Sequence, residues 1–320
     1  MIGPPTGDRF HNEGATPAGG YRSPGRNLRA PFDSSLIFPT PTIVAQANRL
    51  AQWPAQANRL APHGNHMRLL AELRDGLTAL AYPALCQVCG VMIDRYDDGV
   101  ACAACWTDAE ITPLFGSSLC VRCGLPLAGS QAGDRALSCG SCETFVFTTA
   151  RACGAYAGAI EASILFLKSH PHLCRRLRHM ILRTFAEQQP ALAADVIVPV
   201  PLHRRRRRER GFNQAELIAR VIARQTRLPL APRLLTRAKP TERHRAGLDA
   251  RDRARSVAGA FRVPYPRAVI GMTILLVDDV FTTGSTLSAA ARALLDAGAQ
   301  HVKVLTIARV VAARPAGRAR

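Results

Sequence analysis

Two acidic residues followed by a hydroxyl-rich loop form the stretch of this chain best suited to chemistry. Ile274–Val277 is apolar, Asp278 and Asp279 follow directly, and Thr282-Thr283-Gly284-Ser285-Thr286 leads into a helix-forming segment, 287–297. The apolar run predicts a strand buried on both faces of a parallel sheet. Open α/β sheets bind ligands at the carboxyl ends of their strands, and small residues at a helix N-terminus favour anions. We therefore expect a ribose diol at the acids and a phosphate at the loop. The alternative is a buried strand that ends in an ordinary capped turn.

The cysteines have the spacing of metal ligands. Eight of the ten form four Cys-x-x-Cys pairs; twelve residues separate the first two pairs, and fifteen separate the last two. Thiolate-only sites favour zinc, and a site with no open position is structural. We expect two structural zinc ions with sequential pairing; crossed pairing, an iron–sulfur cluster and free redox thiols are the alternatives. Cys153 and Cys174 fall outside this spacing, which is typical of small buried hydrophobic residues. The predicted ligands are Cys86, Cys89, Cys102, Cys105, Cys120, Cys123, Cys139 and Cys142.

A second polar turn follows another short apolar strand, 195–201, which is stopped by prolines. Arginine suits forked recognition of phosphate oxygens, so this turn is the candidate pyrophosphate site, with Arg210 as its first candidate. The charge run 204–208 is more typical of a solvated face or a flexible loop. His203 is expected to be positional rather than catalytic. Lys168 could either reach the phosphates or serve as a helix C-terminal cation. The phosphate and pyrophosphate candidates are Pro201, Arg204, Arg210 and Lys168.

Strands and helices alternate from Arg151 onward, which predicts a mostly parallel sheet with flanking helices. Asn213 is the expected N-cap of a helix that ends near Arg227. The Arg-rich segment 236–256 has weak periodicity and is expected to be a loop or arm. The other expected strands are 152–156, 195–201 and 302–307, and the other expected helices are 159–167 and 173–188.

Composition limits the classes of function. The chain has 320 residues, of which 48% are hydrophobic, enough for one or two domains with real cores. The sequence has no apolar run of about 18 residues and no signal peptide, so we expect a cytoplasmic protein without a membrane span. The net charge is −1 over residues 1–150 and +20 over the rest. This excess indicates either a solvated basic surface or a partner with phosphate groups.

Four segments are expected. Residues 1–66 are rich in Pro, Gly, Asn and Ser and read as a disordered leader, so translation could start at Met1 or Met67. Residues 67–145 contain the cysteine pairs and are expected to form a small double zinc ribbon. The α/β domain is expected over 150–310, and 311–320 is a basic tail.

These motifs together resemble a known family. Ile274–Thr286 is similar to the thirteen-residue signature of type I phosphoribosyltransferases, which bind phosphoribosyl pyrophosphate (PRPP). Pro199-Val200-Pro201-Leu202-His203 and Arg210-Gly211-Phe212-Asn213-Gln214-Ala215-Glu216-Leu217 resemble the ComF family (competence protein F or GntX-like proteins). That family also has an N-terminal double zinc ribbon. The resemblance extends over about residues 67–310.

The resemblance implies roles for the residues already singled out. Asp278 and Asp279 would contact the ribose hydroxyls, the loop 282–286 would bind the 5′-phosphate, and Mg²⁺ would accompany PRPP. A phosphoribosyl group would pass to an unknown acceptor with release of pyrophosphate, and the family name suggests DNA uptake. The segment 241–256 departs from the family pattern, which puts transferase activity in doubt. A non-catalytic protein that handles single-stranded DNA, with DNA-uptake proteins as partners, is the alternative.

Overall fold

The computed structural model describes residues 84–93, 95–111, 119–127, 139–238 and 259–311. The expected leader 1–66, nearly all of the tail 311–320 and most of the arm 236–256 lie outside the described residues. Of the helices that are described, none has both the length and the apolar character needed to cross a bilayer.

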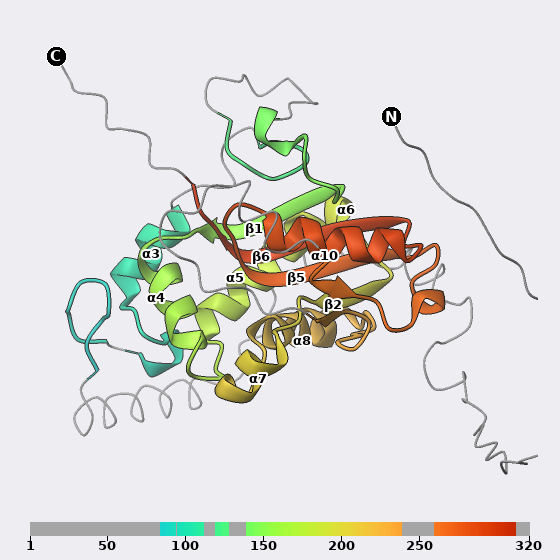
Figure 1. Ribbon diagram of the computed structural model, residues 1–320. Helices are drawn as coiled ribbons and strands as arrows, with labels where there is room; N and C mark the ends of the chain where they lie inside the picture. The colour runs from blue at the N-terminus through green and yellow to red at the C-terminus, as the bar shows by residue number, and fades with distance from the viewer. Residues whose placement is uncertain (1–83, 94, 112–118, 128–138, 239–258, 312–320) are drawn as a thin grey trace, which may run out of the picture. The chain divides into compact units, whose positions relative to one another are not determined.

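A parallel sheet forms the centre of the α/β domain (Figure 1). Its strands lie in the order β1–β6–β5–β2, and all three neighbouring pairs are parallel. The central strands are almost continuously apolar because helices cover both faces. A separate antiparallel pair joins β3 to β4. These features confirm the predicted fold class. The strands are β1 (Thr149–Ala155), β2 (Val196–Pro199), β3 (Thr236–Arg237), β4 (Phe261–Arg262), β5 (Thr273–Phe281) and β6 (His301–Arg309).

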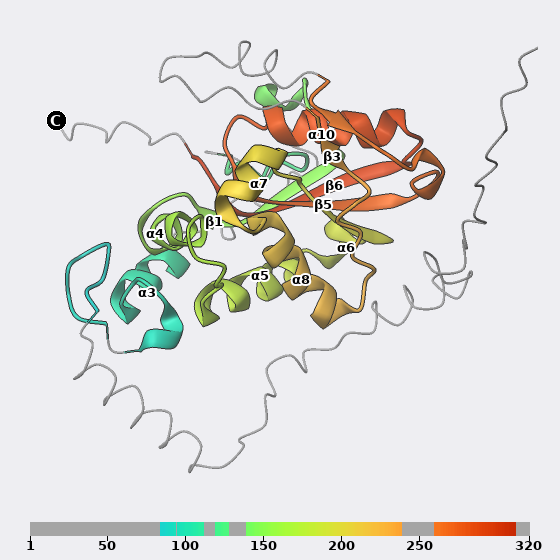
Figure 2. The ribbon, with the colours of Figure 1, turned by 60° about the horizontal axis from the view of Figure 1, so that its bottom comes forward.

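Helices flank the sheet on both sides, with α10 over one face and α5 and α8 over the other (Figures 1 and 2). Asn213 caps α8 as predicted, because its side chain accepts a hydrogen bond from the backbone N–H of Ala215 at 3.2 Å. The bounds are α3 (Ala103–Ile111), α4 (Gly158–Leu167), α5 (Arg175–Glu187), α6 (Gln189–Leu192), α7 (Arg204–Arg210), α8 (Gln214–Thr226) and α10 (Ser285–Asp296), with short 3₁₀ turns η3 (Tyr96–Asp98), η4 (Gly140–Cys142) and η5 (Pro266–Ala268).

The core has two layers, because successive side chains of a strand point to opposite faces. Leu275 of β5 packs in the layer that contains α4, α5 and α8, whereas Ile274 packs with α10. The cysteine-rich segment contributes to both layers. Trp106 and its neighbours join the first layer, and Phe147 and its neighbours join the second. The two halves of the cysteine-rich segment therefore pack on opposite faces of the sheet.

The structure corrects several expected boundaries. β5 does not end before the acids but continues to Phe281, because Val280 and Phe281 stay paired with Ala308 and Arg309 of β6. β1 begins three residues earlier than expected, and β6 ends two residues later. Cys153 and Cys174 are buried, with 1% and 4% exposure, as predicted.

The arginine run after β2 is a helix, α7, rather than a loop, although it remains solvated as expected. His203 caps it by accepting a hydrogen bond from the backbone N–H of Arg205 at 3.3 Å. Arg205 also donates to Glu209 one turn later at 2.9 Å. Gly211 ends the helix with a left-handed φ of 79°. The cap supports the expected positional role of His203.

Candidate functional site

The first four cysteines meet in one cluster. Cys86 lies 3.8 Å from Cys105 and Cys89 lies 3.6 Å from Cys102, measured between sulfur atoms. The Cys86 sulfur also accepts hydrogen bonds from the backbone N–H groups of Val88 and Cys102, at 3.4 and 3.3 Å. Burial raises the pKa of Cys86, but the backbone N–H groups of Cys89, Cys102 and Val88 outweigh it and lower the pKa to about 6. These donors therefore favour a thiolate at Cys86.

The second four cysteines form a separate cluster. Cys120 lies 3.3 Å from Cys142, and Cys123 lies 3.5 Å from Cys139, measured between sulfur atoms. The backbone N–H of Cys139 donates to the Cys120 sulfur at 3.3 Å. Burial again raises the pKa of Cys120, and backbone donors lower it to about 6. The predicted sequential pairing, 86/89 with 102/105 and 120/123 with 139/142, is confirmed.

Both clusters fit a tetrahedral ion. Within each cluster all four sulfur atoms lie within 4.8 Å of one another. A zinc–sulfur bond of about 2.3 Å sets the sulfur–sulfur edge of a tetrahedron at about 3.8 Å, close to the separations seen here. No pair approaches the disulfide bond length of about 2.05 Å, and all eight cysteines are free thiols. The two clusters are therefore consistent with two closed metal sites.

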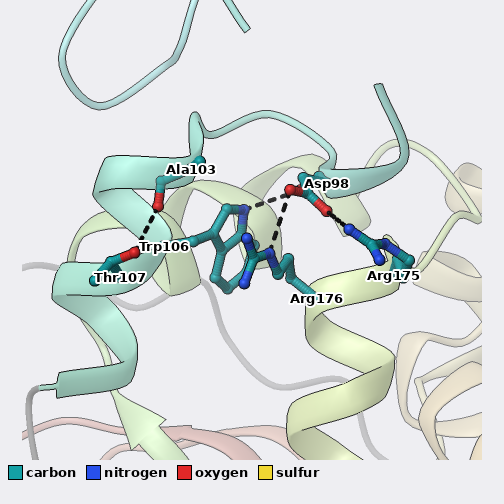
Figure 3. Close-up of polar contacts among 6 residues, drawn as sticks. All are labelled: Asp98, Ala103, Trp106, Thr107, Arg175 and Arg176. Carbon is teal, nitrogen blue, oxygen red and sulfur yellow. Dashed lines mark hydrogen bonds and ion pairs between the residues drawn. The ribbon is translucent and has the colours of Figure 1, made fainter. Parts of the chain in front are cut away.

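A buried carboxylate fastens the first cluster's segment to the α/β domain (Figure 3). The Asp98 side chain is 2% exposed and accepts from Arg175 at 3.0 Å and from Arg176 at 3.2 Å. Its backbone oxygen accepts from the Trp106 indole N–H at 2.9 Å. Both arginines belong to the first turn of α5. These contacts join η3, α3 and α5 at one point.

The acids Asp278 and Asp279 lie near the carboxyl end of β5, beside β2 and β6. One oxygen of Asp278 accepts from the backbone N–H of Asp279 at 2.9 Å, and one oxygen of Asp279 accepts from that of Val280 at 2.8 Å. These bonds fix both carboxylates. Burial, and next the charge of Asp279, raise the pKa of Asp278 well above its ordinary value. A negative charge on one carboxyl group thus disfavours a negative charge on the other, and a hydroxyl donor or a cation would reduce this repulsion.

The loop 282–286 passes directly from β5 into α10. Gly284 is the N-cap residue of α10 and has a left-handed φ of 76°. The hydroxyls of Thr283 and Ser285 are 2.9 Å apart. The first N–H groups of a helix have no partner within the helix, and its dipole attracts anions. Gly284, Thr283 and Ser285 are therefore arranged at a helix start that suits a phosphate.

Two arginines, Arg210 and Arg237, interact electrostatically with the acids. Partial burial lowers the pKa of Arg210, and the nearby Asp279 opposes that shift. Burial lowers the pKa of Arg237, and the nearby Asp278 opposes it. Arg206 lies close enough to both guanidinium groups to lower their pKa values further. The structure thus places Arg210, the first pyrophosphate candidate, within electrostatic range of Asp279.

The other phosphate candidates are placed less directly. Pro201 follows β2, and the preceding residue, Val200, donates its N–H to Val277 of β5 at 2.9 Å. This bond keeps the turn next to the acid-bearing strand. Arg204 is the exposed first residue of α7. Lys168 is the C-cap residue of α4, a position that fits a helix C-terminal cation; its contact with a phosphate stays a prediction.

Sequence reasoning did not identify Arg237, Tyr156 or Arg309 as part of this region. Burial, then the charges of Glu161 and Asp279, raise the pKa of Tyr156. Arg309 ends β6 and is only 6% exposed. Arg309 could have been singled out from the sequence, because it is a basic residue at the end of a long apolar strand. Arg237 offered no comparable signal, because all but three of the 42 basic residues of the chain are arginines.

Comparison with known proteins agrees with this geometry. A phosphoribosyl transferase domain model matches residues 237–320, and a double zinc ribbon domain model matches residues 77–143. The DNA utilization protein YhgH of Escherichia coli K12 is 32% identical over 243 residues, which are 72% of this chain and 100% of YhgH. Competence protein F of Haemophilus influenzae is 33% identical over 42% of this chain and 58% of its own length.

Two further similarities cover shorter stretches. Competence protein ComFC of Bacillus subtilis is 36% identical over 36% of this chain and 44% of its own length. Among solved structures, the glutamine PRPP amidotransferase of B. subtilis is 21% identical, with a TM-score of 0.28. That match covers 52% of this chain and 30% of the amidotransferase, so the chain spans less than a third of that enzyme. Full-length similarity to YhgH and the two domain matches establish that the chain belongs to the ComF/YhgH family, with a phosphoribosyltransferase domain and an N-terminal double zinc ribbon.

Proposed function

We propose that the chain binds PRPP, or a related ribose 5-phosphate, at the carboxyl ends of β5 and β2. The observation that carries this proposal is the position of Asp278 and Asp279, immediately before the loop 282–286 and the start of α10. Carboxylates accept hydrogen bonds from two adjacent hydroxyls, which suits the ribose diol. The loop supplies backbone N–H groups and the hydroxyls of Thr282, Thr283, Ser285 and Thr286 to the 5′-phosphate.

The pyrophosphate group belongs, in this proposal, at the turn after β2. Arg210 interacts electrostatically with Asp279 and has the forked guanidinium that suits phosphate oxygens. Arg237 interacts in the same way with Asp278. Arg204, Pro201 and Lys168 remain candidates for outer contacts. The negative charges of a ligand with several phosphate groups would compensate the positive charges of the arginines at this end of the sheet.

Mg²⁺ fits the donor set as a companion of the ligand. It prefers oxygen ligands and keeps several waters, so it needs few protein groups. One oxygen of Asp278 and one of Asp279 accept a backbone hydrogen bond, and the other oxygen of each would be the ligand offered to the ion. The ion would supply charge neutralisation at the pyrophosphate oxygens. The protein residues orient the ribose and the two phosphate groups around it.

The reaction that we propose is displacement of pyrophosphate at the anomeric carbon, with transfer of the phosphoribosyl group to an acceptor. Positioning and charge stabilisation would supply most of the rate enhancement. Arg210 and Arg237 would stabilise the departing negative charge. The segment 239–258, which departs from the family pattern in part, lies outside the described residues.

Calorimetric titration with PRPP and Mg²⁺ tests the binding proposal. Wild-type protein is expected to bind one PRPP per chain, and Asp278→Asn combined with Asp279→Asn is expected to abolish the heat. Asp296→Asn is the matched control, because Asp296 is an exposed acid at the C-terminal end of α10, far along the chain from the loop 282–286. Absence of binding by the wild type would refute the proposal, and so would unchanged binding by the double variant.

A second candidate function is contact with single-stranded DNA through α7. Four of its six arginines are exposed, with 79% exposure for the Arg205 side chain and 56% for that of Arg207. The relatives' names refer to competence and DNA utilization. Binding to single-stranded DNA should then weaken with salt, with a slope of about −0.7 per phosphate contacted. A flat salt response, or equal binding by Arg205→Gln combined with Arg207→Gln, would remove this candidate.

We assign a structural role in this scheme to the two cysteine clusters, each holding one zinc ion. Every donor in each cluster is a cysteine, which leaves no open position for a substrate. We propose 67–145 as the zinc-binding module, 150–310 as the phosphoribosyltransferase-like domain and 311–320 as a basic tail.

A further inference from the structure

The second cysteine cluster lies close to the loop that follows β5. Arg309 joins the two. Its guanidinium donates to the backbone oxygen of Cys123 at 2.8 Å and lies 3.5 Å from the Cys123 sulfur. The same guanidinium stacks on the ring of Phe281 at 4.1 Å. Phe281 is the last residue of β5, directly before the loop 282–286. One buried side chain therefore contacts both a cysteine ligand and the root of the loop.

An aromatic group supports the same loop. Phe145 follows the last cysteine of the cluster, and its ring lies 5.6 Å from that of Phe281. Phe147 packs 5.0 Å from Phe145 and 5.9 Å from Phe281. A methyl group on Gly284 would lie 2.7 Å from both Phe145 and Phe281. The backbone of the loop at Gly284 thus packs against the rings of Phe145 and Phe281, and Phe145 belongs to the segment that follows the second cysteine cluster.

The charge of Arg309 makes this contact dependent on the state of the cluster. A buried cation is costly without a partner. Four thiolates around a divalent ion carry a net negative charge, which compensates the guanidinium. Loss of the ion would release the four cysteine side chains, and Arg309 would then lose the fixed position of Cys123, whose backbone oxygen accepts its hydrogen bond.

The first cluster has no corresponding connection among the described residues. Its segment packs in the core layer of α4, α5 and α8 and is fastened at Asp98 to α5. The second cluster packs in the layer of α10, together with Phe281. Within the part of the chain that the structure describes, it is the second cluster that contacts the residues supporting the loop.

We propose that Arg309 is a positioning residue that couples the second cysteine cluster to the loop 282–286. Metal in that cluster keeps Arg309, Phe281 and Gly284 in the arrangement that receives a phosphate group. Loss of that metal loosens the loop and weakens ligand binding, whereas loss of metal from the first cluster does not. The coupling follows from the contacts above, and only its consequence for PRPP rests on the proposed function.

Hydrogen exchange measured by mass spectrometry on the full chain tests the coupling without any ligand. Arg309→Met retains the length of the side chain but removes the charge and both hydrogen bonds. It should speed exchange at residues 282–288 about tenfold or more, the effect of losing a charge-assisted hydrogen bond. Exchange in α5 should stay within about twofold of wild type. Arg309→Lys, which keeps a cation, should give an intermediate rate.

Metal-ligand variants give the second comparison. Cys139→Ser disrupts the second cluster and should speed exchange at 282–288, whereas Cys89→Ser disrupts the first cluster and should not. Unchanged exchange in Arg309→Met would overturn the coupling. Equal acceleration in the loop and in α5 would also overturn it, because it would indicate a general loss of stability. Equal exchange rates in Arg309→Lys and Arg309→Met would show that the positive charge of the side chain does not hold the loop.

The affinity for PRPP provides a third test of the coupling. If the wild type binds PRPP with Mg²⁺, then Arg309→Met and Cys139→Ser should bind about tenfold more weakly, and Cys89→Ser within about twofold of wild type. Equal binding by all variants would overturn the coupling. If the wild type does not bind PRPP, the proposed function fails, and the exchange comparison still decides whether Arg309 couples the cluster to the loop.

Discussion

Replacement of Gly284 by alanine tests whether the loop after β5 is held as tightly as its contacts indicate. The new methyl group would lie 2.7 Å from Phe145 and 2.7 Å from Phe281, and the backbone would keep a φ of 76°. A left-handed conformation costs an L-residue about 1–2 kcal/mol. Overpacking of a filled site costs about 1–3 kcal/mol more. The free energy of unfolding should therefore fall by about 2–5 kcal/mol.

Gly271 provides the matched control for this substitution. Its φ is 70°, but a methyl group there would meet nothing within 4 Å. Gly271→Ala should therefore show the backbone cost alone, about 1–2 kcal/mol. Urea unfolding in zinc-saturated buffer, followed by circular dichroism, gives both values. A difference between the two variants of less than about 0.5 kcal/mol would refute the tight packing of Phe145 and Phe281 against the loop.

Three further outcomes are expected. Asp98→Ala should lower the free energy of unfolding by about 2–3 kcal/mol, because it removes the buried carboxylate that accepts from Arg175 and Arg176. Asp296→Ala is the exposed control. Equal losses of stability in a urea titration of the two variants would contradict the stabilising role of Asp98. The pKa of Asp278 is raised in the folded state, so the folded protein binds more protons there and loses stability as pH rises from about 4, the unfolded value, through the raised pKa. Asp278→Asn should gain stability relative to wild type with rising pH, and a pH-independent difference would contradict the raised pKa. Elemental analysis should find two zinc ions per chain and one in Cys89→Ser; one ion in the wild type would show that one cluster does not hold zinc.

Local sequence signals predicted most of the fold because they act over short distances. The Cys-x-x-Cys spacing predicted both clusters and favoured the sequential pairing that the structure has, but it left crossed pairing as an alternative. Asn213 marked the start of α8 because its side chain caps a backbone N–H two residues away. The apolar runs of β2, β5 and β6 predicted a parallel sheet, since only strands buried on both faces need such runs.

Features that depend on distant partners were not predictable in this way. β5 continues past its acids only because β6 lies alongside it. The run 204–210 has no apolar face that would signal a helix, and its capping and ion pairs decide the outcome. Arg309 contacts Cys123 across 186 positions of sequence. No local pattern of residues encodes such a contact.

The central claim, a phosphoribosyl site at the carboxyl ends of β5 and β2, is tested most directly by mapping where PRPP and Mg²⁺ slow hydrogen exchange. Protection is predicted at the loop 282–288 and at the turn and helix 200–213, with α3 and α5 unchanged. Protection confined to α3, α5 or the cysteine clusters, or no protection at saturating PRPP, would contradict the account.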